Sequence, residues 1–298
     1  MTHGFITIAT GDTQYYKMAG NLLHSYRYFS ASPLPFAILA DQENEYTAEF
    51  DTVRLFSHAH CNYLDKLEMF SLLPYDVNLF IDADCLAYGD LNRLFTLFQN
   101  ADDFSCFGRV LPLDDTTGWF EYKNLGKLQE KVSYVVGLHG GIYYMRKTER
   151  CRTVLETAQK LVPHYREYRF KGKFATPGDE PLVALSMALN GCKPIPHDLQ
   201  GILCYWEHLG KMWLNLPKGI ALAQDVGIKT DLLHWGTRFT KTPQYRKQVD
   251  DLCTMEQGGS RMALWAHALQ YGAAEMRDHA IHLVKRCWNK LQRVLSVK

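Results

Sequence analysis

The sequence has no long apolar run and no start that resembles a leader peptide. Within its 298 residues, no stretch reaches the ~18 uncharged apolar residues that a membrane-spanning helix requires. Residues 1–5 have no basic region followed by an apolar core, so we expect no signal peptide. We therefore expect a cytoplasmic protein, at most peripheral on the inner face of a membrane.

Closely spaced cysteines and a large net charge are also missing. The 8 cysteines include no Cys-x-x-Cys pair, which excludes a zinc ribbon or a small disulfide scaffold and favours reduced thiols. The formal net charge is +1, so no global field attracts nucleic acid, and we expect no nucleic-acid partner. Hydrophobic residues make up 47% of the chain, which is ordinary for a globular protein with a large core.

Short apolar segments alternate with helical patterns through the first hundred residues. The predicted strands are residues 5–10, 35–40, 53–56 and 77–81. Helical spacing of apolar residues lies between them, as in the segment 64–73 before Pro74. This alternation predicts an α/β fold with a doubly wound, mostly parallel sheet, in which ligands lie beyond the carboxyl ends of the strands.

The second half continues this pattern and then changes in composition. Strands are predicted at 104–110 and 140–145, a long loop at 111–131, and helices at 151–161 and from Asp179 onward. After residue 258 the chain is rich in helix formers. Apolar residues recur there at spacings of three and four, with basic residues between them, at Ile281, Val284, Trp288, Leu291 and Leu295.

This last pattern predicts a basic amphipathic helix that contains a tryptophan. We therefore divide the chain into a domain of residues 1–250 and a helical extension of residues 251–298. Two interpretations of the extension stay open. Its apolar face packs on the domain, or residues 276–298 contact an anionic membrane surface.

Two aspartates directly follow the apolar strand at 77–81. Asp82 and Asp84 are two positions apart, so in an extended chain both side chains point to the same side. Carboxylate oxygens suit a hard divalent cation, which keeps positions open for phosphate oxygens. Two acidic residues also end many strands without any such role, and the motif alone leaves that interpretation open.

A different enzyme class also uses this motif. A hydrophobic strand that ends in Asp-x-Asp resembles the nucleophile loop of haloacid-dehalogenase-like phosphatases, whose first Asp attacks phosphorus and whose second is the acid and base. In those enzymes a Thr or Val usually follows, near the start of the chain. Here Cys85 follows, after eighty residues of strand and helix pattern. The phosphatase is therefore the alternative to a metal and nucleotide site.

A longer resemblance covers roughly residues 5–245. Its central block runs from Lys66 through Leu73-Pro74 and the strand to Asp82-Ala83-Asp84, and it resembles glycosyltransferase family 8. Further segments are similar to that family in the same order: Ala9-Thr10-Gly11-Asp12, Gly140–Arg146, Asp179-Glu180 and Leu232–Gly236. The resemblance implies a GT-A fold, in which two Rossmann-like halves share a mixed, mostly parallel sheet.

The resemblance also implies roles for the residues in these segments. The donor would be a UDP-sugar, and Mn²⁺ or Mg²⁺ would lie on Asp82, Asp84 and His234, since a neutral imidazole is an acceptable third ligand. Asp179 and Glu180 would be the catalytic residues beside the sugar, although the first turn of a helix favours acidic residues in any case. The implied donor contacts are Ala9, Thr10, Tyr15, Lys66, Asp82, Ala83, Arg238 and Lys241.

The sequence departs from the family pattern at two places. Glu180 stands where the family usually has Gln, so a carboxylate could face the anomeric carbon. Gly236 comes one residue early and Lys241 one residue late, which leaves open whether Arg238 or Lys241 contacts the diphosphate. The resemblance implies transfer of a hexose, with retention, to a hydroxyl of a carbohydrate or glycolipid acceptor. A catalytically degenerate nucleotide-binding scaffold is the second alternative.

Overall fold

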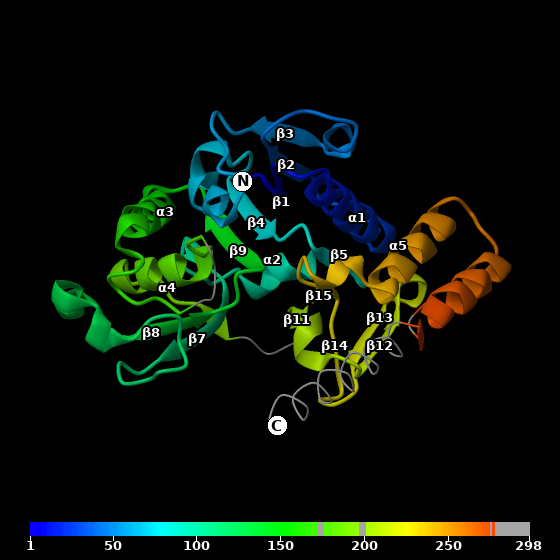
Figure 1. Cartoon of the computed structure of the whole chain (residues 1–298). Coiled ribbons are helices and arrows are strands. Elements are labelled where there is room, and N and C mark those ends of the chain that lie inside the picture. Colours follow the sequence, from blue (N-terminus) through cyan, green and yellow to red (C-terminus); the bar gives the residue numbers. More distant parts are fainter. Residues whose placement is uncertain (172–175, 197–200, 275, 278–298) are drawn as a thin grey trace, which may run out of the picture.

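The centre of the molecule is a mixed six-stranded sheet. The computed structural model describes residues 1–171, 176–196, 201–274 and 276–277, and its main sheet has the order β3-β2-β1-β4-β9-β6 (Figure 1). The first four strands are parallel, and β9 and β6 are antiparallel to their neighbours. Their bounds are β1 (His3–Ala9), β2 (Phe36–Ala40), β3 (Thr52–Leu55), β4 (Val77–Ile81), β6 (Phe104–Ser105) and β9 (Ile142–Arg146).

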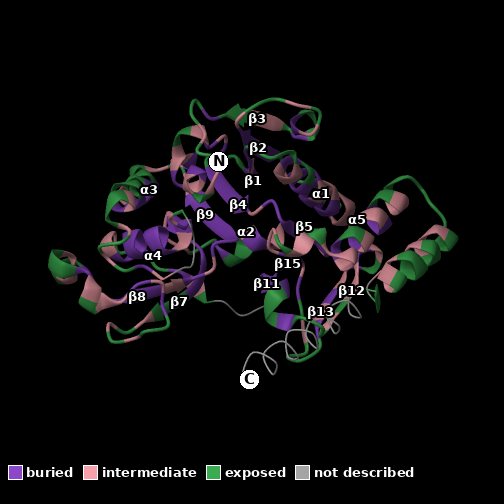
Figure 2. Cartoon of the chain, viewed as in Figure 1, coloured by how far each residue is buried: buried purple, intermediate pink, exposed green. Residues whose placement is uncertain are grey.

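Alternate residues of the sheet face two separate cores. Ile6 and Phe80 pack on one face, whereas Phe5 and Leu79 pack on the other, as the period of two in a strand requires. Both faces are covered, so β2 and β4 are buried along their whole length (Figure 2). This burial explains why they read as continuous apolar runs rather than alternating ones.

Helices cover both faces of this sheet. One face carries α1 (Thr13–Phe29), which begins where the Asp12 carboxylate accepts a hydrogen bond from the Gln14 N–H at 2.9 Å. The other face carries the 3₁₀ helix η2 (Tyr63–Leu72), α3 (Glu149–Leu161) and α4 (Asp179–Leu189) (Figure 1). This arrangement is the predicted α/β architecture.

Three smaller three-stranded sheets complete the strand arrangement. Their orders are β10-β7-β8, β11-β15-β5 and β12-β13-β14. In the second of them β15 lies between β5 and β11, so His234 lies opposite both Cys85 and Cys204. The bounds of these strands are β5 (Cys85–Ala87), β7 (Phe107–Leu111), β8 (Val135–Leu138), β10 (Ile195–Pro196), β11 (Leu203–Cys204), β12 (Met212–Asn215), β13 (Ile220–Ala223), β14 (Ile228–Lys229) and β15 (Leu232–His234).

The remaining helices are short, apart from α5. They are η1 (Thr47–Glu49), α2 (Arg93–Leu97), η3 (Tyr122–Asn124), η4 (Gly126–Lys131), η5 (Val162–His164), η6 (Tyr205–His208), η7 (Leu216–Lys218), η8 (Phe239–Lys241) and α5 (Pro243–Glu256). The predicted loop at 111–131 therefore contains two 3₁₀ helices. The predicted strand at 104–110 is divided at Cys106 into β6 and β7, which join different sheets.

The chain continues as helix beyond the expected domain boundary. That boundary falls inside α5, and residues 261–274 form a further helix (Figure 1). His267 Nδ1 of this helix lies 3.0 Å from Asp251 Oδ1 of α5, whereas Met262, Trp265 and Leu269 are exposed. The division at residue 250 stays a prediction. All but the first two residues of the predicted membrane contact at 276–298 lie outside the described residues.

A search of the described helices for a membrane span gave none: each is too short or too polar to cross a bilayer.

The turn that leads into β4 offers a test of the fold. Asn78 is fully buried, and its side chain accepts from the Tyr75 N–H at 3.2 Å and donates to the Tyr75 carbonyl at 2.8 Å. We expect Asn78→Ala to lower the free energy of unfolding by about 2 kcal/mol, because it leaves two backbone groups without partners. Urea denaturation measures this. The exposed Asn100→Ala is the control, and equal stability of the two variants would contradict the account.

Candidate active site

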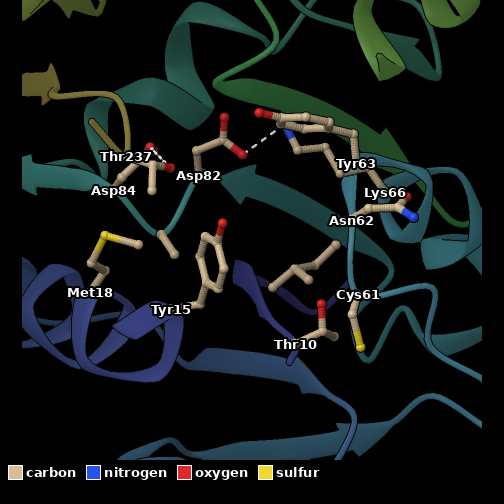
Figure 3. A pocket seen from close by; sticks show the side chains of 12 residues that line it. Thr10, Tyr15, Met18, Cys61, Asn62, Tyr63, Lys66, Asp82, Asp84 and Thr237 are labelled. Atoms are coloured by element: carbon tan, nitrogen blue, oxygen red, sulfur yellow. Dashed lines mark hydrogen bonds and ion pairs between the residues drawn. The ribbon is translucent and has the colours of Figure 1, made fainter. Parts of the chain in front are cut away.

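A cavity of about 210 Å³ opens where β1 and β4 end. Its walls come from the residues after β1, from α1, from the start of η2 and from the segment that joins β4 to β5 (Figure 3). The cavity therefore lies at the carboxyl ends of parallel strands, as expected for ligand sites in such sheets. Thr10, Tyr15, Lys66, Asp82 and Ala83, which are among the predicted donor contacts, all line it.

The two aspartates are held by backbone contacts on both sides. The Asp82 N–H donates to the Gly141 carbonyl at 3.0 Å, next to β9, and the Trp235 N–H donates to the Asp84 carbonyl at 3.0 Å, next to β15. The second contact brings His234 to the aspartates. Its Nε2 lies 3.0 Å from Asp84 Oδ1 and 3.7 Å from Asp82 Oδ2. The structure thus brings together the three predicted metal ligands, although they are far apart in the sequence.

Lys66 supplies a positive charge to the same group of carboxylates. Its Nζ lies 2.8 Å from Asp82 Oδ1 (Figure 3) and 3.3 Å from Asp179 Oδ2. Burial alone would lower the pKa of Lys66, but attraction by Asp179 and Asp82 outweighs it and raises the pKa above its ordinary value. The ammonium group is therefore charged and ties the aspartate segment to the start of α4.

The two aspartates differ in their electrostatic surroundings. Burial raises the pKa of Asp82, and the charges of Lys66 and His234 oppose this only in part. Burial acts on Asp84 too, but His234 and a hydrogen bond from the Thr237 hydroxyl at 3.0 Å hold its pKa below the ordinary value. Burial alone would lower the pKa of His234, yet Asp84 raises it. Asp84 and His234 therefore form an ion pair in the absence of metal.

This donor set fits a divalent cation. Nε2 of His234 lies within 3.7 Å of a carboxylate oxygen of each aspartate, and a divalent cation can replace the imidazolium proton at this position. The ligand atoms of Asp84, Cys85 and His234 all lie within 4.8 Å of one another. Oxygen and imidazole ligands suit manganese or magnesium, whereas the Cys85 thiol would suit a softer ion.

Asp179 and Glu180 form the first turn of α4 and face the aspartate segment. Asp179 is buried, and it accepts a hydrogen bond from the Tyr143 hydroxyl at 2.6 Å as well as the contact from Lys66. Glu180 Oε1 accepts from the Gly140 N–H at 2.9 Å. Burial and the negative charge of Asp179 raise the pKa of Glu180 to about 7. The two predicted catalytic residues thus adjoin the predicted metal ligands through Lys66 and the Gly140–Gly141 backbone.

Of the predicted nucleotide contacts near the end of β1, the side chains of Thr10 and Tyr15 line the cavity and the side chain of Ala9 does not. The Thr10 hydroxyl donates to Asp65 Oδ2 at 2.7 Å, and Tyr15 projects into the cavity from α1 (Figure 3). The Ala9 side chain instead packs in the hydrophobic core beneath the sheet. The structure therefore does not place Ala9 in the wall of the cavity.

The two predicted diphosphate cations lie outside this cavity. Arg238 is exposed, with its guanidinium carbon 5.7 Å from the ring centre of Phe239. Lys241 is also exposed and lines a neighbouring hollow between α1 and α5, together with Lys17 and Arg246. The structure therefore does not bring Arg238 or Lys241 to the aspartates. The residue of this segment that reaches them is Thr237, through its bond to Asp84.

Several lining residues were not predicted from the sequence. They are Ile8, Met18, Cys61, Asn62, Tyr63 and Thr237. Asn62 caps η2 by accepting from the Leu64 N–H at 2.8 Å, so a helix-start pattern could have placed it next to Lys66. No local pattern points to Thr237, because its position depends on the pairing of β15 with β5.

Comparison with known proteins identifies the fold. No family model and no curated protein matches the sequence. Among solved structures, an active-site mutant of LgtC with glutamate in place of glutamine is similar over 85% of this chain and 95% of its own, with 10% identity and a TM-score of 0.52. The glycosyltransferase GlyE of Streptococcus pneumoniae TIGR4 is similar over 80% of this chain, with 12% identity and a TM-score of 0.50.

These likenesses confirm the predicted GT-A fold, because both similar structures are of glycosyltransferases or their mutants. This chain spans 56% of the length of the GlyE chain. At these identities the comparison establishes the fold alone. The chemistry of this chain therefore has to be argued from its own residues.

The raised pKa of Glu180 gives a pH dependence to stability. The folded pKa is about 7 and the ordinary value is 4.5, so the folded protein keeps a proton that the unfolded chain releases. The stability from this group is complete below pH 4.5 and is lost as the pH rises to about 7, at a cost of about 3 kcal/mol. Glu180→Gln keeps the acceptor for Gly140 but cannot lose a proton.

We therefore expect Glu180→Gln to lose less stability than the parent protein between pH 5 and pH 7.5. Urea denaturation in excess chelator, which keeps divalent metals away, measures this difference. The exposed Glu130→Gln is the control and should follow the parent protein. Parallel stability profiles for Glu180→Gln and the parent would contradict the prediction.

Proposed function

We propose that the protein is a metal-dependent glycosyltransferase that moves a hexose from a UDP-sugar to a hydroxyl group of a carbohydrate or glycolipid. The observation that carries this proposal is the convergence of Asp82, Asp84, His234, Lys66 and the Asp179-Glu180 pair at one edge of the cavity. A GT-A fold places a nucleotide-sugar diphosphate at such an edge. The carboxylates and the cavity therefore supply a place for a metal and for a donor side by side.

Asp82, Asp84 and His234 would hold the manganese or magnesium ion. A bound ion neutralises charge on a departing diphosphate. His234 must be neutral to act as a ligand, so its proton leaves as the ion binds. Lys66 keeps the Asp82 side chain in place through its 2.8 Å contact and offsets the charge of Asp179 beside it.

The donor would lie along the cavity from Thr10 to the aspartates. Tyr15 and Thr10 line this cavity, where a base and ribose would lie, and Ala83 would contribute a backbone group. The cavity of about 210 Å³ is smaller than the ~300–1,000 Å³ of common ligand pockets. The sugar would therefore extend from it toward Asp179 and Glu180. Arg238 and Lys241 would reach the diphosphate only by a change in side-chain position.

Asp179 and Glu180 would act on the sugar. Asp179 would accept hydrogen bonds from sugar hydroxyls, with Tyr143 and Lys66 fixing its orientation. Glu180 as a carboxylate would stabilise positive charge that develops at the anomeric carbon. Retention of configuration is the outcome implied by the resemblance to glycosyltransferase family 8. Residues 276–298 would be the part of the helical extension that contacts a membrane surface carrying a glycolipid acceptor.

A ligand screen tests the donor and the metal together. A ligand that binds only the folded state raises the melting temperature, and at 100 times its Kd it adds about 2.7 kcal/mol of stability. We expect UDP-sugars with Mn²⁺ to raise the melting temperature by several degrees, and the same sugars in chelator to have little effect. GDP-sugars and ADP-sugars are the controls for the base. An equal rise with and without metal would contradict the metal role.

Substitution of the aspartates tests the reaction. We expect Asp82→Ala with Asp84→Ala to lower transfer by at least about 1,000-fold, since both carboxylates would position the charge that stabilises the leaving group. The exposed Asp114→Ala is the control. Circular dichroism checks that the double variant is folded. Full transfer by the double variant would refute the proposal, and phosphate release from simple phosphoesters by the parent would favour the phosphatase.

A further inference from the structure

His234 has a second ring nitrogen that the aspartate site does not use. Nε2 faces Asp84 and Asp82, whereas Nδ1 is buried and has no hydrogen-bond partner among the described residues. A side chain added at Gly141 would begin 3.0 Å from this Nδ1 and 2.8 Å from Cε1 of His139. The free nitrogen therefore points away from the aspartates, into a space that it shares with His139.

A thiol and a second imidazole occupy this space. His139 Nε2 lies 2.7 Å from Cys204 Sγ, and the rings of His139 and His234 meet edge to face with centres 5.4 Å apart. His139, Cys204 and His234 each offer one ligand atom, and these three atoms lie within 4.8 Å of one another. His234 and Cys204 are buried, while His139 is partly exposed and offers a route from solvent.

We propose that His139, Cys204 and Nδ1 of His234 form a binding site for zinc or a similar thiophilic divalent cation. A thiolate and two imidazoles select such an ion over manganese or magnesium. Three protein ligands and one water complete a tetrahedral zinc site, with Zn–N of ~2.0–2.1 Å and Zn–S of ~2.3 Å. Ligand atoms around such an ion lie roughly 3.5 Å apart. Binding therefore lengthens the 2.7 Å distance between His139 Nε2 and Cys204 Sγ by roughly 0.8 Å. The Cys204 thiol proton leaves to solvent, and the His139 proton moves from Nε2 to Nδ1, which gives up the hydrogen bond that it accepts from the Gly141 N–H at 3.1 Å.

Occupation of this site has a consequence for the aspartate site, and this second part rests on the proposed function. A neutral imidazole has one nitrogen with a free lone pair and one that carries a proton. With zinc on Nδ1, the proton stays on Nε2 and donates to Asp84 Oδ1, at the 3.0 Å separation already present. His234 is then withdrawn from the manganese or magnesium ion. The thiophilic ion thus competes with the metal that the proposed transfer needs.

Cobalt binding to the full-length protein tests the site without any assay of activity. Co²⁺ substitutes for zinc, and a thiolate ligand gives it a charge-transfer absorption band. We expect this band in the parent and in Cys253→Ser, whose thiol is exposed on α5. We expect Cys204→Ser to lose the band, and His139→Gln to weaken Co²⁺ binding by roughly 100-fold through loss of one ligand. If Cys204→Ser does not fold, Co²⁺ binding to His139→Gln decides whether the site exists.

Cys85→Ser separates this site from the other cysteine next to His234. Its thiol belongs to the cluster with Asp84, so our proposal expects the band to persist in Cys85→Ser. A band that survives in Cys204→Ser but disappears in Cys85→Ser would overturn the proposal. Absence of a band in the parent protein would overturn it as well.

Manganese binding, followed by the electron paramagnetic resonance signal of free Mn²⁺, tests the competition. We expect one equivalent of Zn²⁺ to raise the apparent Kd for Mn²⁺ by at least 10-fold in the parent but not in Cys204→Ser. An equal rise in both proteins would mean that zinc enters the aspartate site directly, and would refute the competition. If neither protein binds Mn²⁺, the metal role in the proposed function fails, while the cobalt result still decides the thiolate site.

Discussion

The sharing of positive charge among buried carboxyl groups governs the arrangement of the whole site. Lys66 lies between Asp82 and Asp179, and His234 lies between Asp82 and Asp84. A buried carboxylate without a cation is costly, so each of these contacts is a condition for the folded site. The charge on His234 is a proton and can be exchanged for a metal ion, whereas the charge on Lys66 is permanent at neutral pH.

The fold supplies these contacts by joining two sheets at one short segment. Asp82 directly follows β4 of the main sheet and is held by the Gly141 carbonyl, and three residues later, at Cys85, β5 begins its pairing with β15 in a different sheet. The aspartate segment is therefore fixed at both ends by strands of two different sheets. Because the sheets are built from distant parts of the chain, the site exists only when the whole domain has formed.

Residues on regular elements near the motif could be predicted from the sequence, and residues brought in by long-range pairing could not. The apolar strand that ends at Asp82 is a local signal, and the family resemblance added Lys66 and His234. The core position of the Ala9 side chain and the exposure of Arg238 depend on packing that no spacing encodes. The same is true of Cys204, which reaches His234 through the pairing of β11 with β15.

The short helix η2 carries Asp65 and Lys66 as neighbours. Asp65 holds the Thr10 hydroxyl at 2.7 Å and the His60 N–H at 2.6 Å, while Lys66 holds Asp82 and Asp179. A ligand that draws Thr10 toward itself therefore pulls on the same helix that positions the ammonium group beside the aspartates. Under the proposed function, nucleotide and metal would then be coupled through η2, and by reciprocity each would change the affinity for the other by the same factor.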